Sequence, residues 1–133
     1  EINGKVIEMK VHTSMNTNSL AQEMALAAAR VDRAYVRRQV KIWQSRRDVI
    51  YGGLIKLGFS LWRPEGAFYA LPKIKNSGRV VSELFYKYKV IVYDGLWFGA
   101  PGRIRLSYAL DEKKIEEGLK RIEKFLKGKE GWL

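Results

Sequence analysis

A segment near the C-terminus carries the residues best suited to chemistry. Residues 102–109 read Gly-Arg-Ile-Arg-Leu-Ser-Tyr-Ala, and this alternation predicts a β-strand with two different faces. The faces are Ile104, Leu106 and Tyr108 on one side and Arg103, Arg105 and Ser107 on the other. A guanidinium held on a strand can grip a carboxylate through two parallel hydrogen bonds. Taken alone, however, the strand favours a solvated face for these arginines, because isolated surface charges seldom carry function.

The composition excludes several other chemistries. The chain has 133 residues, of which 47% are hydrophobic, so we expect one folded domain over residues 1–133. It has no cysteine and one histidine, which argues against disulfides, thiolate catalysis and a histidine-based metal site. Because no apolar run is long enough to span a bilayer and the N-terminus lacks a signal-peptide pattern, the sequence predicts a soluble, cytoplasmic protein without a membrane partner.

The formal net charge of +11 raises the alternative of a basic nucleic-acid-binding α+β module. One predicted helix concentrates basic side chains: Arg37, Arg38, Lys41, Arg46 and Arg47. Three aromatic residues further along are candidates for stacking on bases: Trp62, Phe68 and Tyr69. We favour a solvated helix face and do not expect nucleic acid as a partner, because apolar periodicity explains the helix and the aromatics fit a hairpin core equally well.

The segments before the arginine strand are predicted mainly as helices. Asn18 or Ser19 is a suitable N-cap for a helix over residues 20–29. A longer helix follows over residues 32–57, with an apolar stripe formed by Val36, Val40, Trp43, Ile50, Leu54 and Leu57. After it the period changes, and residues 59–62 and 67–71 predict a β-hairpin around Arg-Pro-Glu-Gly.

The remaining elements place the arginine strand inside a small sheet. Residues 79–88 predict a helix, and residues 90–93 an apolar strand at the centre of the sheet. An aromatic, glycine-rich loop over residues 96–102 leads to the arginine strand. Asp111 would cap a final helix whose stripe is Ile115, Leu119, Ile122 and Leu126. The predicted fold class is α+β, a two-layer domain with a small, mainly antiparallel sheet and helices packed on one face.

Several of these motifs, in this order, resemble one known family. They are residues 18–25 (Asn-Ser-Leu-Ala-Gln-Glu-Met-Ala), 64–69 (Pro-Glu-Gly-Ala-Phe-Tyr), 90–95 with Phe98-Gly99, and 105–109 (Arg-Leu-Ser-Tyr-Ala) before the last helix. The chain resembles the C-terminal small domain of class I/II, fold-type I pyridoxal-phosphate-dependent aminotransferases, nearest to the aspartate aminotransferase-like branch. The resemblance implies that Arg105 binds the α-carboxylate of the amino- or oxo-acid substrate and that this domain closes over the site.

The sequence also departs from the family pattern. Asp94 stands where the family usually has a proline, and the loop from Phe98 to Arg105 is short. No Ser-Lys motif for the Schiff-base lysine and no glycine-arginine cofactor segment is present, so the resemblance places both upstream of Glu1, in a chain with the large cofactor-binding domain. We therefore expect no catalytic or cofactor-binding residue here, an inactive isolated chain, and pyridoxal phosphate only in a homodimeric parent enzyme. A third interpretation is a self-associating domain, exposing the surface that would face the missing domain.

Overall fold

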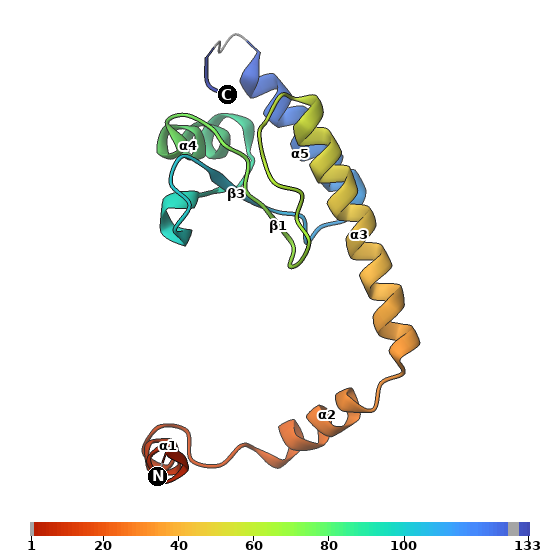
Figure 1. Ribbon diagram of the computed structural model, residues 1–133, viewed down its shortest axis with the longest axis vertical. Coiled ribbons are helices and arrows are strands. Elements are labelled where there is room, and N and C mark those ends of the chain that lie inside the picture. The colour runs from red at the N-terminus through yellow and green to blue at the C-terminus, as the bar shows by residue number, and fades with distance from the viewer. Residues whose placement is uncertain (1, 128–130) are drawn as a thin grey trace. The chain divides into compact units, whose positions relative to one another are not determined.

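The computed structural model describes residues 2–127 and 131–133. Its helices are α1 (Ile2–Thr13), α2 (Ser19–Ala29), α3 (Arg33–Lys56), α4 (Ser77–Tyr88), α5 (Glu112–Leu126) and the short 3-10 helix η1 (Gly95–Phe98), and its strands are β1 (Tyr69–Ala70), β2 (Tyr93–Asp94) and β3 (Ile104–Ser107). Figure 1 shows these elements along the chain. The described chain divides into two compact units, with the boundary between Arg38 and Gln39 inside α3.

The first unit consists of α1, α2 and the first residues of α3. The Asn18 side chain caps α2 by accepting a hydrogen bond from the backbone N–H of Ala21 at 2.8 Å, as the sequence predicts. Neither α1 nor α2 buries a residue, although both carry apolar side chains. The expectation that residues 1–133 form one domain stays a prediction.

The second unit contains a three-stranded antiparallel sheet in the order β1-β3-β2. The arginine strand β3 is therefore central, with Tyr69 opposite Ser107 on one side and Tyr93 opposite Arg105 on the other. Side chains of Tyr69 and Tyr93 consequently come from the two strands that flank Arg105. The register brings together residues that lie far apart in the sequence.

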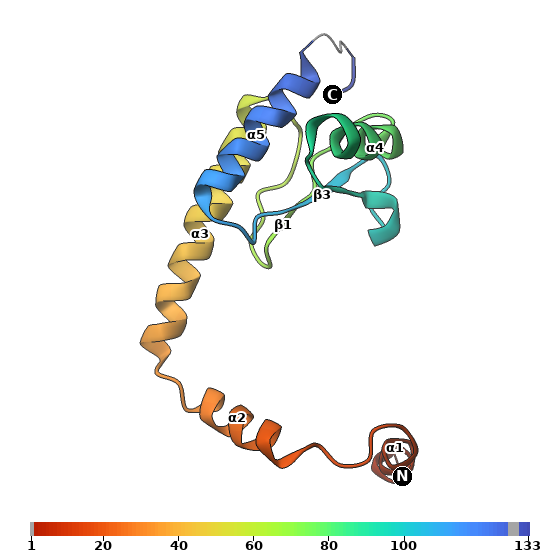
Figure 2. The same ribbon diagram turned by 180° about the vertical axis from the view of Figure 1, so that it is seen from behind.

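Helices cover the apolar face of this sheet. The second half of α3 lies beside α5 (Figures 1 and 2), and a Cβ on Gly53 would touch the side chain of Leu119. The core joins these two helices, α4 and β3, and its fully buried side chains include Leu54, Leu84, Ile104, Ile122 and Phe125. The α+β class, with a small antiparallel sheet and helices on one face, is confirmed.

The last helix follows the sequence pattern closely. Asp111 caps α5 by accepting a hydrogen bond from the backbone N–H of Lys114 at 2.9 Å. One turn apart, Glu117 pairs with Arg121, and Glu123 pairs with Lys127 at 3.2 Å. Gly128, whose residue type commonly ends a helix and was expected to do so here, lies outside the described residues.

The predicted hairpin is wrong. Residues 59–62 form no strand, and β1 pairs with β3 instead. The carbonyl of Ser60 accepts a hydrogen bond from the N–H of Lys73 at 2.8 Å, so this segment runs beside the chain that follows β1. Local alternation predicts an extended backbone but does not identify its partner.

Two other expectations are corrected by the structure. Val36 and Val40 are exposed by 53% and 47%, so the apolar stripe of α3 is buried only in its second half. The strand expected over residues 90–93 is reduced to Tyr93–Asp94 and lies at the edge of the sheet. The reason is local, because the N–H of Val90 bonds back to the carbonyl of Leu84 in α4 at 2.9 Å.

Candidate functional site

Strand β3 presents its two arginines in different environments. The apolar face is buried as the alternation predicts, at Ile104, Leu106 and Tyr108. On the opposite face, Arg103 is 7% exposed and Arg105 is half-buried. A solvated face for both arginines is therefore wrong.

Arg103 is held by the fold itself. Its Nη1 donates a hydrogen bond to the carbonyl oxygen of Leu71 at 2.7 Å. Its guanidinium carbon lies 3.9 Å from the ring centre of Trp62, which stacks on it from the segment before β1. Arg103 thus connects the central strand to the chain on both sides of β1, at Trp62 and at Leu71.

Arg105 is held by aromatic rings. Its guanidinium carbon lies 3.5 Å from the ring centre of Phe98, 4.4 Å from that of Tyr69 and 5.2 Å from that of Tyr93. We call these three rings the aromatic cage. Within the described residues, the Arg105 guanidinium has no hydrogen bond or ion pair to protein atoms. Its N–H donors therefore remain available to a ligand.

The ring of Phe98 is positioned by the turn that contains η1. The carboxylate of Asp94 accepts hydrogen bonds from the backbone N–H of Leu96 and from the hydroxyl of Ser77, each at 3.0 Å. Gly95 is required at the start of the turn, because a Cβ there would collide with the carbonyl oxygen of Ala100. The Asp94-Gly95 pair thus makes a tight turn without the proline usual in the family.

The ring of Tyr69 is positioned by the loop before β1. Ala67 has a left-handed backbone with φ of 55°. Its carbonyl accepts a hydrogen bond from the hydroxyl of Tyr108, and the carbonyl of Phe68 accepts one from the N–H of Tyr108, both at 3.0 Å. Burial raises the pKa of the Tyr108 hydroxyl, so it stays a neutral donor at physiological pH. One buried tyrosine therefore fixes where β1 begins.

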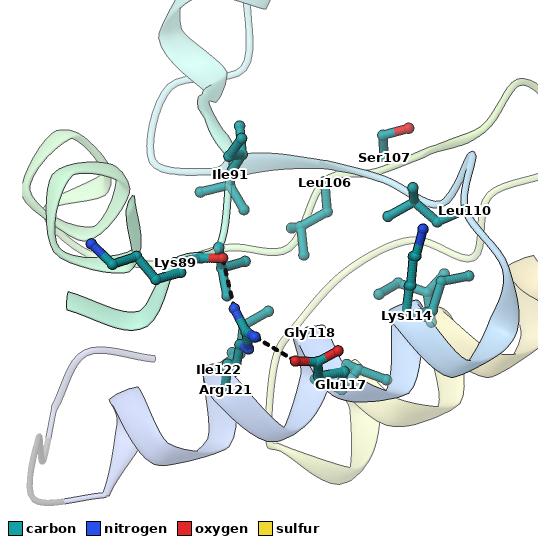
Figure 3. A pocket seen from close by; sticks show the side chains of 15 residues that line it. Lys89, Ile91, Leu106, Ser107, Leu110, Lys114, Glu117, Gly118, Arg121 and Ile122 are labelled. Atoms are coloured by element: carbon teal, nitrogen blue, oxygen red, sulfur yellow. Dashed lines mark hydrogen bonds and ion pairs between the residues drawn. The ribbon is translucent and has the colours of Figure 1, made fainter. Parts of the chain in front are cut away.

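A separate cavity of about 290 Å³ lies between β3, the segment after α4 and α5 (Figure 3). Its walls are mainly aliphatic, with Lys89, Lys114 and Arg121 among the lining residues. Arg121 is already engaged, because it pairs with Glu117 and donates to the carbonyl of Lys89 at 3.0 Å. The cavity therefore lacks the free guanidinium that the cage provides.

Comparisons with known proteins place the chain in a family. The family model described as aminotransferase class I and II matches residues 7–122. The chain belongs to this family. It is 34% identical to the aspartate aminotransferase of Bacillus subtilis over 125 residues, which cover 86% of this chain and 32% of that protein. It is 37% identical to a probable aspartate/prephenate aminotransferase of Aquifex aeolicus, covering 88% of this chain and 34% of that protein.

Solved structures show the same likeness in three dimensions. The crystal structure of the aspartate aminotransferase of Thermotoga maritima matches with a TM-score of 0.84 at 34% identity, over 91% of this chain and 32% of that one. The chain thus spans about a third of the length of the aminotransferases it matches. The predicted family, aspartate aminotransferase-like, is confirmed.

The described residues do not form a site for pyridoxal phosphate by themselves. The cofactor attaches through a lysine amine and needs groups that cradle its phosphate. The side chains that stack on Arg105 are aromatic, and Lys89 and Lys114 line an aliphatic cavity whose arginine is already paired. No metal-binding cluster of three or more His, Asp or Glu occurs in the described part of the chain. Among the same residues, no helix is long and apolar enough to cross a membrane.

The sequence predicted Arg105 as the substrate-binding residue, and this role stays a prediction. It did not predict the three rings around Arg105 as a unit. Tyr69, Tyr93 and Phe98 lie 36, 12 and 7 residues before Arg105 by their numbers in the sequence. No local period connects them. The signal that could have found them is the strand register, which places Tyr93 directly opposite Arg105.

Proposed function

We propose that this chain is the substrate-clamping part of a pyridoxal-phosphate-dependent aminotransferase of the aspartate type, in which Arg105 binds the α-carboxylate of the amino- or oxo-acid substrate. The observation that carries the proposal is a half-buried guanidinium without a protein carboxylate, within the described residues, on the central strand of the sheet. Natural relatives named as aspartate aminotransferases support the reaction class.

The chemistry asked of Arg105 is binding and orientation. A planar guanidinium and a planar carboxylate form two parallel charge-assisted hydrogen bonds, which fix both the position and the rotation of the ligand. Fixing the substrate in this way lowers the entropic cost of reaching a reactive geometry. Arg103 is a poor candidate for the role, since Leu71 and Trp62 already occupy its guanidinium.

The rest of the reaction belongs to parts that this chain does not supply. Pyridoxal phosphate, when bound in the parent enzyme, supplies the electron sink for transamination. We assign its Schiff-base lysine and its large cofactor-binding domain to the other two-thirds of the polypeptide seen in relatives, and propose a homodimer in the cytoplasm. This chain would close over the bound substrate and would be inactive alone.

The proposal is tested in the complete polypeptide that contains this chain. Arg105→Lys keeps the positive charge but loses the two-pronged geometry, so kcat/KM for amino and oxo acid should each fall by roughly a hundredfold, as loss of charge-assisted hydrogen bonds predicts. Arg63→Lys is the matched control, because Arg63 is exposed and forms an ion pair with Asp48 at the surface, away from the cage. Unchanged kinetics for Arg105→Lys would contradict the role.

The nucleic-acid alternative has a simple counter-test. The 133-residue chain is titrated with a fluorescent oligonucleotide at low salt and again at raised salt. Tight binding that weakens steeply with salt would favour the basic module. We expect negligible binding, because the aromatic candidates already have partners in the chain, although Trp62 and Phe68 are exposed: Trp62 stacks on Arg103, and Phe68 packs on Trp43 and Tyr69.

A further inference from the structure

We propose that Tyr69, Tyr93 and Phe98 are positioning residues that hold the Arg105 guanidinium ready for a carboxylate in the absence of any ligand. The inference rests on the proposed role of Arg105 and extends it to three side chains from three separate elements. These side chains act through Arg105 rather than on the reacting atoms.

An empty arginine clamp carries an entropic cost. A long arginine side chain without a partner samples many rotamers, and ordering it on binding lowers the affinity for the ligand. An internal carboxylate would order the side chain but would compete with the ligand for the same N–H donors. Aromatic faces attract the cation without using those donors, because the attraction comes from the ring quadrupole. A cage of rings therefore orders Arg105 and leaves its hydrogen-bonding edge free.

The distances agree with rings that order the Arg105 side chain and leave its N–H donors free. The ring centre of Phe98 is nearest to the Arg105 guanidinium carbon, at 3.5 Å, and those of Tyr69 and Tyr93 follow at 4.4 and 5.2 Å. The rings also brace one another, since Phe98 and Tyr93 meet edge to face with centres 6.4 Å apart. The ring centre of Trp97 lies 6.3 Å from that of Tyr93, but among the described residues the rings that stack on Arg105 are those of Tyr69, Tyr93 and Phe98.

Arg103 offers an internal comparison on the same strand face. It too stacks on a ring, but its Nη1 is consumed by the carbonyl of Leu71. Arg105 has ring contacts alone within the described residues. The difference indicates that stacking serves structure at Arg103 and readiness at Arg105.

The experiment uses the 133-residue chain and follows the side-chain Nε–H signal of Arg105 by NMR while succinate is added at constant ionic strength. Protons above an aromatic face are shielded, so we expect an upfield Arg105 signal in the wild type that moves on succinate binding. Phe98→Leu should shift the free signal downfield and weaken succinate binding about threefold to tenfold, equivalent to about 0.7–1.4 kcal/mol. Tyr93→Phe keeps the ring and should bind as the wild type does.

Trp97→Leu is the matched control, because it removes an exposed ring of the same turn that packs against Tyr93 but does not stack on the Arg105 guanidinium. It should leave the Arg105 signal and the succinate affinity unchanged. If Phe98→Leu responds to succinate as the wild type does, the cage inference is overturned while the proposed carboxylate role stands. If wild-type Arg105 does not respond to succinate more than to chloride, the carboxylate role itself fails and the inference falls with it. Backbone spectra of each variant show that the fold is retained.

Discussion

Both units of the chain contain helices with apolar side chains, but the two units bury these side chains to very different degrees. Helices α1 and α2 carry exposed apolar side chains such as Ile2, Met9, Leu20 and Met24, and neither helix has a buried residue. The unit from Gln39 to Leu133 contains all the buried hydrophobic side chains of the described core cluster. Helix propensity and an N-cap are enough to form a helix, but tertiary packing supplies most of its stability. The first unit should therefore be the weaker structure.

The largest test compares one leucine from each unit. Leu54 in α3 is 0% exposed and Leu20 in α2 is 67% exposed. Leu54→Ala should lower the free energy of unfolding by about 2–5 kcal/mol, and Leu20→Ala should change it by less than about 0.5 kcal/mol. Urea titration followed by tryptophan fluorescence is suitable, because all four tryptophans lie beyond residue 38. Equal losses in the two variants would show that both units share one core.

The contact of α3 with α5 is tested by two adjacent glycines. A Cβ on Gly53 would overlap the side chain of Leu119, whereas one on Gly52 meets nothing within 4 Å. Gly52→Ala should stabilise the unit by up to about 1 kcal/mol through helix propensity. Gly53→Ala should be less stable than Gly52→Ala by about 1–3 kcal/mol, since Leu119 must leave its packed position. Thermal unfolding of the two variants measures the difference, and equal melting temperatures would disprove the close contact.

Removing one helix cap from each unit compares the two units by two different spectroscopic signals. Asp111 caps α5 in the packed unit and Asn18 caps α2 in the exposed one, at 2.9 and 2.8 Å. Asp111→Ala should cost about 1 kcal/mol in the fluorescence-detected transition. Asn18→Ala should leave that transition in place and reduce the helical circular dichroism signal of the native chain. A fluorescence shift in Asn18→Ala would mean that α2 contributes to the core unit.

The smallest effect is a dependence on pH. Hydrogen bonds from Arg47 and Arg63 hold the pKa of Asp48 below its ordinary value of 3.8. Backbone hydrogen bonding by Lys114 likewise lowers the pKa of Asp111. Because the folded state favours the charged carboxylates, their contribution is present above about pH 4 and is lost as the pH falls through the lowered folded pKa.

The melting temperature of the packed unit should accordingly decrease on acidification below about pH 4. Asp48→Asn removes one of the two carboxylates, so its melting temperature should depend less steeply on pH over the same range. The same slope in the wild type and Asp48→Asn would show that the pair with Arg47 and Arg63 does not favour the folded state.

The sequence predicted helices better than strands for a physical reason. The pattern Ile115, Leu119 and Ile122 is local, since hydrogen bonds of a helix join residues four apart, and α5 forms where it predicts. Strand pairing joins distant residues, and nothing near Tyr69 shows that its partner is Ser107. The hairpin and the central position of residues 90–93 were therefore wrong.

The candidate site divides in the same way. Arg105 was predicted through the family resemblance, whose motif Arg-Leu-Ser-Tyr-Ala is local, whereas its own strand favoured a solvated face. The cage was not, because Tyr69, Tyr93 and Phe98 meet only after β1, β2 and η1 have assembled around β3. Charge also misled the local reasoning at Arg103, whose burial depends on Trp62 and on the carbonyl of Leu71.

The attachment of each ring of the aromatic cage sets the timescale on which that ring can move. The carbonyls of the two residues before Tyr69 accept hydrogen bonds from Tyr108, and Tyr69 itself pairs with Ser107. The backbone of Tyr69 can therefore move away only when the sheet opens, on the slow timescale of local unfolding. Phe98 sits at the end of one exposed 3-10 turn, where loop motions take nanoseconds to microseconds. A carboxylate that approaches Arg105 therefore meets one wall that stays still during the encounter and another that can swing aside.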